Sequence, residues 1–136
     1  MKNRELTVET GTEPALTDLT GACAGFLAEV AAVAGLLTVF VPHATAGVVV
    51  VELGAGSDAD LLAALQRLLP HDDRWRHRHG SPGHGADHVL PLLVSPSLTI
   101  PVVAGRMTLG TWQSIALLDP NTDNVRRTVQ LSFLAG

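Results

Sequence analysis

The sequence of 136 residues has one cysteine, no tyrosine and an aromatic content of only 4%. Its single thiol, Cys23, excludes an internal disulfide framework and a zinc site built from cysteines. Basic residues are also few, with 9 Lys and Arg against 13 Asp and Glu, for a formal net charge of −4. Because a binder of duplex nucleic acid needs a basic face to neutralise phosphates, we expect no nucleic-acid partner.

The chain also lacks an apolar run long enough to span a membrane. The longest one, residues 30–41, ends at Pro42, whereas a bilayer crossing takes about twenty residues. No charged segment followed by an apolar one opens the chain, as an export signal would. We therefore expect a cytoplasmic protein with no membrane partner. With 46% apolar and 16% charged residues, the chain is not disordered, and its length suits a single domain, 1–136.

Hydrophobic patterning predicts an α+β fold, a mainly antiparallel, β-sandwich-like domain with two or three helices. Alternating or continuous apolar runs predict strands, and three- and four-residue apolar spacing predicts helices. The expected strands are 4–9, 15–19, 36–41, 47–53, 98–103, 111–118 and 127–134, and the expected helices are 20–34, 57–69 and 88–94.

Local signals set the expected ends of these elements. Thr20 is placed to cap the first helix, and Gly35 to follow its end in a left-handed conformation. Ser57 and Asp60 have the spacing of a capping box for the second helix. The connection 42–46 is too short for a helical crossover, which predicts that the strands on either side of it are antiparallel neighbours.

Histidine is the residue type that is present in excess. Five of the six histidines lie within eighteen residues, in and just after an expected surface loop over 71–87: His71, His77, His79, His84 and His88. His77 and His79 would lie on one side of an extended segment, and His84 and His88 are one helical turn apart. Either pair suits two ligands of one metal ion, but neither completes a site. For His71 and His79, a solvated loop is the favoured interpretation.

Three further polar residues have both a structural and a functional interpretation. His43 follows a buried strand and is either a site residue or a hydrogen-bonded structural group. Glu52 ends an apolar strand, which indicates a carboxylate that is either exposed or beside a functional cleft. Asp60 is explained by its place in the first turn of a helix, whatever the function.

The segment 105–113 has glycines near both ends and predicts a hairpin with close backbone approach. Arg106 could bind a phosphate or carboxylate, and Trp112 offers a stacking face, although a core role is the more frequent one for tryptophan. The chain has neither a phosphate-binding Gly-rich loop ending in Gly-Lys-Ser/Thr nor a Gly-x-Ser-x-Gly elbow, which argues against nucleotide hydrolysis and serine-hydrolase chemistry.

Taken in order, these motifs resemble the YjbQ-like family, often called secondary thiamine-phosphate synthases. The resemblance covers essentially the whole chain, and its most distinctive stretch is Leu-Gly-Thr-Trp-Gln at 109–113. The other matching parts are Gly35-Leu36, Val39 to Ala46, Glu52, Asp60-Leu61, Pro70, His77, His88, Pro96 to Val102 and Gly105-Arg106.

The resemblance implies a homotrimer in which His43, His77 and His88 converge on one pocket and hold a divalent metal, zinc or magnesium. It implies a catalytic group of His43, Glu52, His77, His88 and Gln113, and a substrate-binding group of Thr45, Asp60, Arg106 and Trp112. The chain departs from the family pattern at Ala44, where a threonine is usual, and at Asp119, where a glutamate is common. His84 stands where the family has an asparagine and could add a fourth imidazole.

The function that the resemblance implies is transfer of a pyrimidine group to a small phosphorylated substrate. A hydroxymethylpyrimidine pyrophosphate would be joined to a thiazole phosphate, with release of pyrophosphate. The leaving pyrophosphate needs neutralisation by a metal or by arginines, of which Arg106 and the series Arg74, Arg76 and Arg78 are available. Two alternatives use the same residues: a metal-dependent hydrolase with Glu52 as base, and a non-catalytic trimeric protein that binds a metal or an anion.

Overall fold

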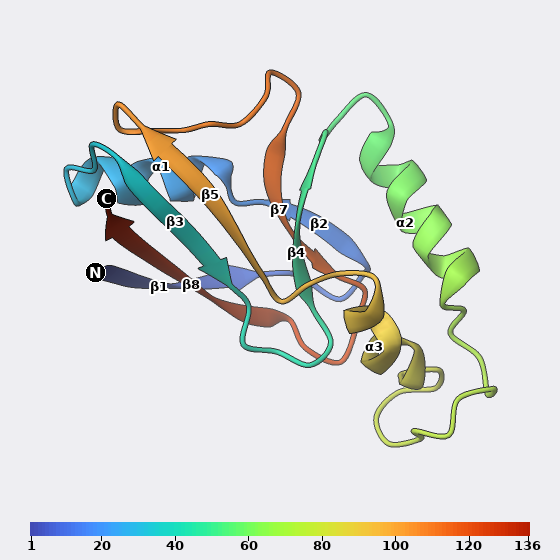
Figure 1. The fold of residues 1–136 in the computed structure, drawn as a ribbon. Coiled ribbons are helices and arrows are strands. Elements are labelled where there is room, and N and C mark those ends of the chain that lie inside the picture. The colour runs from blue at the N-terminus through green and yellow to red at the C-terminus, as the bar shows by residue number, and fades with distance from the viewer.

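Eight strands form two antiparallel sheets, with three helices around them, in a computed structural model that describes all 136 residues (Figure 1). In chain order the elements are β1 Lys2–Glu9, β2 Ala15–Asp18, α1 Thr20–Glu29, β3 Gly35–Phe40, β4 Gly47–Val51, α2 Ser57–Leu68, α3 Gly85–Val89, a short 3-10 helix Leu90–Leu92, β5 Ser97–Val103, β6 Arg106–Met107, β7 Ser114–Asp119 and β8 Arg126–Ala135.

The two sheets enclose the main hydrophobic core. One sheet has the strand order β1-β8-β3-β5-β6, and the other has the order β2-β7-β4. Alternate residues of β3 and β8, such as Leu37, Val39 and Leu131, point inward and meet Leu117 of β7 and Phe26 of α1. The predicted α+β, mainly antiparallel fold is therefore confirmed, and its core follows the period-two alternation of the strands.

The prediction that β3 and β4 are antiparallel neighbours is wrong. β3 pairs with β5 and β8, whereas β4 pairs with β7 in the other sheet. The short connection between them crosses from one sheet to the other, and the ends of both strands bond to the segment before β5. The N–H of Val41 donates to Pro96 O at 2.7 Å, and that of Val48 donates to Ser95 O at 2.9 Å. A short loop excludes a helical crossover but does not require a hairpin.

The first helix is shorter than predicted. It ends at Glu29, because Ala31 takes a left-handed conformation with φ 52° and reverses the chain. Gly35 is instead the first residue of β3, with φ 151°, where a Cβ atom would collide with the backbone of β8. Thr20 does not cap the helix; its backbone N–H donates to Asp18 Oδ1 at 2.8 Å.

The second helix stands outside the core, beside β4, and leads from β4 to the histidine-rich segment (Figure 1). The predicted capping box is absent, since left-handed Gly56 (φ 89°) is the N-cap and no side chain bonds there. Asp58 and Asp60 do lie in the first turn, beside the positive end of the helix dipole. None of its 12 residues is buried. None of the helices has the length and apolar character that crossing a bilayer requires.

A second, smaller hydrophobic cluster anchors α3 and the histidine-rich segment. It consists of Leu69, Ala86, Leu90, Val94 and Leu118. The expected helix over 88–94 is thus α3 followed by the 3-10 helix, and it begins three residues early, at Gly85.

Candidate metal centre

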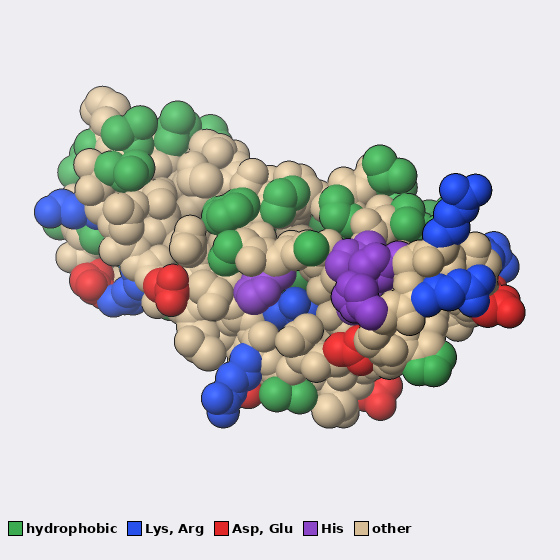
Figure 2. Space-filling model, turned by 90° about the horizontal axis from the view of Figure 1, so that it is seen from below, with side chains coloured by type: hydrophobic (Ala, Val, Ile, Leu, Met, Phe, Trp, Pro, Cys, Tyr) green, Lys and Arg blue, Asp and Glu red, His purple; other side chains and the backbone are tan.

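Four histidine side chains gather on the surface between the end of α2 and α3. The ring centroids of His77 and His79 are 3.9 Å apart, those of His77 and His88 4.0 Å, and those of His84 and His88 4.7 Å. Figure 2 shows the histidines of this region as one broad patch with Lys and Arg side chains beside it. His77 and His79 come from the loop, His84 immediately precedes α3, and His88 lies on that helix.

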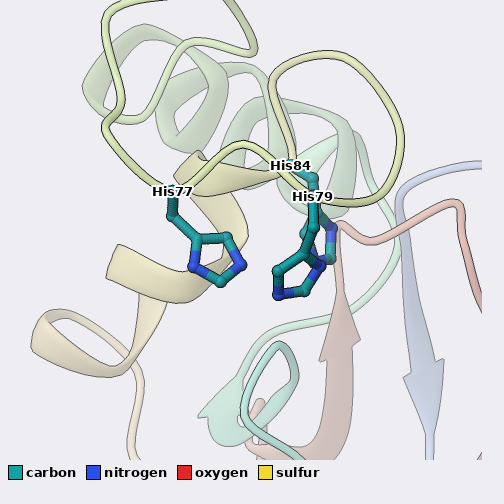
Figure 3. A group of neighbouring side chains, drawn as sticks. All are labelled: His77, His79 and His84. Carbon is teal, nitrogen blue, oxygen red and sulfur yellow. The ribbon is translucent and has the colours of Figure 1, made fainter.

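Three of these rings are close enough together to be candidate ligands of one metal ion. One nitrogen from each of His77, His79 and His84 lies within 4.8 Å of the others, and the rings face a common space (Figure 3). In a tetrahedral zinc site with bonds of about 2.05 Å, ligand nitrogens are about 3.3 Å apart. The present separations extend to 4.8 Å, so the exposed side chains of His77 and His79 would have to move inward to bind one ion.

His88 completes a group of four imidazoles. Its Nε2 atom lies 2.9 Å from Nε2 of His84, a distance at which one nitrogen donates a hydrogen bond to the other. Beside them, His71 Nε2 donates to Oδ1 of the buried Asp87 at 2.7 Å, and this bond fixes the start of the loop to α3.

The surroundings of two of the rings, His77 and His88, favour their neutral form. Desolvation lowers the pKa of His77, and the neighbouring His79 and His84 lower it further. Desolvation also lowers the pKa of His88, followed by the effects of the other three rings. Neutral imidazole is the form that binds a metal ion, so at neutral pH these two rings are available as ligands.

A hollow of about 410 Å³ adjoins the cluster. Its lining includes His77 and His84, the indole of Trp75 and the charged Arg78. Arg78 Nη2 donates to the carbonyl oxygen of Asp73 at 3.0 Å, which holds the guanidinium at the rim. The site therefore combines metal-type ligands with a cation and enough room for a small substrate.

The structure leaves His43, the other histidine of the predicted trio, outside this group. His43 follows β3, and its Nε2 atom accepts the backbone N–H of Thr128 at 2.9 Å. That bond places the ring proton on Nδ1. Burial lowers the pKa of His43, the Arg127 guanidinium lowers it further, and Asp119 opposes the shift. The structure thus brings His77 and His88 together, while His43 serves the end of the sheet.

Thr45, predicted to contact substrate, belongs to a buried polar network. Arg127 is paired with Asp119 through Nε, at 2.7 Å, and through Nη2, at 3.0 Å. The Thr45 hydroxyl accepts from Arg127 Nη2 at 3.0 Å and from Asn121 Nδ2 at 2.9 Å. These contacts satisfy the buried guanidinium, as a buried charge requires.

The remaining predicted site residues lie at the opposite end of α2 or of the sheets: Glu52, Asp60, Arg106, Trp112 and Gln113. Glu52 and Asp60 line an open groove of about 400 Å³ between β4 and α2. The Gln113 side chain accepts the N–H of Gly110 at 2.8 Å and so shapes the turn before β7. Trp112 is not a core residue, since its exposure is 75%, and its predicted contact with substrate stays a prediction. A helix of α2's length spans about 18 Å, so Glu52 is remote from the histidines within one chain.

Sequence reasoning missed His79 as a member of the cluster. It favoured a solvated loop there, and His79 is indeed exposed, yet its ring meets that of His77 edge to face. The signal was the His-Arg-His spacing, which places both rings on one side of the segment.

Two antiparallel sheets, three helices and a surface cluster of imidazoles define an α+β domain with a candidate metal site. The chain belongs to the YjbQ-like UPF0047 family, whose model, described as UPF0047 protein YjbQ-like, matches residues 4–136. The UPF0047 protein Rv2556c of Mycobacterium tuberculosis is 66% identical over 102 residues, which is 75% of this chain and 77% of the relative.

Solved structures show the same fold. A hypothetical protein, APE1520 from Aeropyrum pernix K1, matches with a TM-score of 0.90 and 34% identity over 100% of both chains. A YbjQ-like protein of unknown function from Sulfolobus solfataricus P2 has a TM-score of 0.92 over 99% of this chain and 97% of its own, and at 22% identity it supports the fold alone.

Proposed function

We propose that this chain binds a divalent metal ion through its histidine cluster and acts there on a small phosphorylated substrate. The observation that carries the proposal is the convergence of His77, His79 and His84 within 4.8 Å, with His88 bonded to His84. A bound divalent cation supplies Lewis acidity that neutralises negative charge on phosphate oxygens. Of the two metals that the resemblance implies, we propose zinc, because imidazole suits zinc and magnesium prefers oxygen ligands.

The reaction we propose is the transfer that gives the family its name as thiamine-phosphate synthases. The bond between the pyrimidine methylene carbon and its pyrophosphate oxygen breaks, and a bond from that carbon to the thiazole nitrogen forms. The residues of this chain would bind the leaving pyrophosphate by charge. Arg78, which lines the hollow of about 410 Å³ together with Asp72 and Asp73, is our candidate for that role. Arg76 lies two residues before it on the same loop, and the hollow would take the pyrimidine.

We also propose that the chain assembles as a homotrimer. The outer face of the five-stranded sheet carries the exposed apolar side chains of Leu36, Phe40, Val103 and Leu134, which suit burial against another copy. Such an assembly is also a way in which Glu52 or Gln113 could approach the histidines, since within one chain they lie at opposite ends.

The test measures metal and turnover together. Purified protein should contain about one zinc per chain by mass spectrometry, and a His77→Ala/His79→Ala variant should contain little. His71→Gln is the matched control, because it removes a histidine of the same loop but keeps a donor for Asp87.

The same three proteins are then supplied with the pyrimidine pyrophosphate and the thiazole phosphate. We expect zinc-dependent formation of thiamine phosphate by the wild type and the control, and loss of that activity in the double variant. A wild type with about one zinc per chain but no formation of thiamine phosphate would reject the proposed reaction and leave the proposed metal site standing. Equal zinc in all three proteins would reject the site itself.

A further inference from the structure

His84 is the most constrained ring of the cluster, with only 7% of its surface exposed. Its Nε2 atom faces Nε2 of His88 at 2.9 Å. Its Nδ1 atom is buried, faces two carboxylates and makes no regular hydrogen bond. Asp123 Oδ2 lies 3.2 Å from this nitrogen, and Asp87 Oδ2 lies 3.6 Å from it. The two ring nitrogens therefore have different surroundings, one among imidazoles and the other beside negative charge.

Asp123 comes from a distant part of the chain, the turn between β7 and β8. Its backbone N–H donates to Asn121 Oδ1 at 2.9 Å, and Asn121 is buried in the network around Thr45. Its Oδ2 atom accepts the backbone N–H of Ser81 at 3.1 Å. The same carboxylate oxygen thus contacts the histidine-rich loop and the His84 ring, while its own backbone is fixed to the end of the sheet.

We propose that Asp123 is the positioning residue of this metal site. By facing Nδ1 of His84, the carboxylate keeps the ring proton on that nitrogen and leaves the lone pair on Nε2, directed into the cluster. By accepting the Ser81 N–H, it holds the loop that carries His77 and His79 next to His84. A carboxylate that orients a ligating histidine is a recurrent feature of metal sites, because it fixes the tautomer and raises the basicity of the ligand.

The geometry favours Asp123 over Asp87 for this role. Asp87 already accepts from His71 Nε2 at 2.7 Å, and its other oxygen is farther from His84 than that of Asp123. Asp87 also lies on the same helix as His88, so it cannot tie the loop to the sheet. Asp123 contacts the His84 ring and also bonds to Ser81 of the loop, which is 42 residues away in the sequence.

The proposal rests on the proposed metal site, and its first test is zinc affinity. We measure the affinity for zinc by competition with a chromophoric chelator. Asp123→Asn keeps the size of the side chain and an acceptor for Ser81 but removes the charge beside Nδ1. We expect this variant to bind zinc about 10–100-fold more weakly than the wild type. Asp73→Asn, which removes an exposed carboxylate that is paired with no histidine ring, should stay within about threefold of the wild type.

A second measurement is independent of metal binding. Nitrogen-15 NMR of the imidazoles in the metal-free wild type should show His84 protonated on Nδ1 and His88 protonated on Nε2. A His84 proton on Nε2, or unchanged zinc affinity in Asp123→Asn, would overturn the positioning role. A wild type that binds no zinc would instead reject the proposed metal site, and the NMR result would still decide how Asp123 orients His84. This readout uses only the wild type, so it holds even if the variant folds poorly.

Discussion

At the scale of single residues, His43 extends the sheet beyond the end of a strand. β3 ends at Phe40, which pairs with Gln130 of β8, and Thr128 lies two residues beyond that pair. The His43 ring then accepts the Thr128 N–H that no further β3 residue reaches. A backbone donor in a partly buried position needs such a partner, so this imidazole has a structural role whatever it also does for substrate.

This role makes folding stability depend on pH. Burial and Arg127 lower the pKa of His43 below the value of 6.5 for a free histidine. The ring therefore stays neutral when folded under conditions where it would be protonated when unfolded, so its contribution to stability falls as the pH drops below 6.5. We expect His43→Gln, which keeps an acceptor but does not titrate, to lose less stability between pH 7.5 and 5.5 than the wild type does.

Urea unfolding at the two pH values measures this difference. His43→Ala should be less stable by about 1 kcal/mol at pH 7.5, because it leaves the Thr128 N–H without its partner. His79→Gln is the control, since it removes an exposed histidine with no such bond. An identical loss of stability with pH in the wild type and in His43→Gln would contradict this role.

The sequence allowed some of these residues to be identified and not others. The family resemblance, and not the spacing of the residues, linked His77 with His88, and the two rings do lie in one cluster. His43 could not be assigned from its position after a strand, since ligand and structural roles require the same neighbours. Trp112, predicted to contact substrate, is exposed in the structure. The sequence could not exclude the core role that is more frequent for tryptophan, because burial depends on which elements cover the side chain.

At the scale of elements, α3 fixes the histidine-rich loop by close backbone contact. Gly85, the first residue of the helix, lies against Trp75 and the carbonyl oxygen of His77. A Cβ atom there would overlap Trp75 and lie 2.7 Å from that oxygen. The absence of a side chain therefore lets the loop rest directly on the helix, with the Trp75 indole donating to Pro70 O at 2.8 Å.

Replacement of Gly85 by alanine should therefore displace the loop. We expect Gly85→Ala to weaken zinc binding at least about tenfold, because ligand positions shift, while the two sheets keep their core. Gly21→Ala on α1 is the matched control. No atom lies within 4 Å of its added Cβ, and alanine in a helix should stabilise the protein by about 0.5–1 kcal/mol. Unchanged zinc affinity in Gly85→Ala would show that this contact does not position the loop.

The type of most elements could be predicted because periodicity is local, whereas several of their limits could not. α1 stops where Ala31 adopts a left-handed backbone, and α2 starts after the left-handed Gly56, although Ser57 has the more typical capping side chain. The partner of β4 depends on whether the chain turns back or crosses to the second sheet after Pro42. The pairing of β4 is determined by contacts with strands that are distant in the sequence, so a local pattern cannot predict it.

At the scale of the whole molecule, the outer face of the five-stranded sheet is the surface that would bury most in the proposed trimer. Alternation along β3 turns Leu36 and Phe40 outward, opposite the buried Leu37 and Val39. Leu134 of β8 is the cross-strand neighbour of Leu36 and adds to the same face. These side chains are too exposed to contribute much to the core of one chain.

Light scattering after gel filtration should give three times the mass of one chain for the wild type. Leu36→Glu/Phe40→Glu should shift the protein to the monomer, because two charges would be buried between copies, while the inward residues of β3 are unchanged. Leu68→Glu is the control, since it places a charge at an exposed leucine of α2, away from this sheet. A monomeric wild type, or a trimer that survives both substitutions, would reject this face as the interface.

The division of the hydrophobic residues into two clusters has a consequence for the life of the protein. Every residue of the main core comes from the sheets, from α1 and its N-cap Leu19, or from the β3–β4 connection, and none comes from the loop that carries the histidines. Because β8, the last strand of the chain, lies between β1 and β3, the large sheet forms only once the whole chain has been made, but it needs no metal to do so. If the histidine cluster binds a metal ion as proposed, binding would follow folding as a separate event. Under the proposed metal binding, the metal-free protein would then keep its folded core.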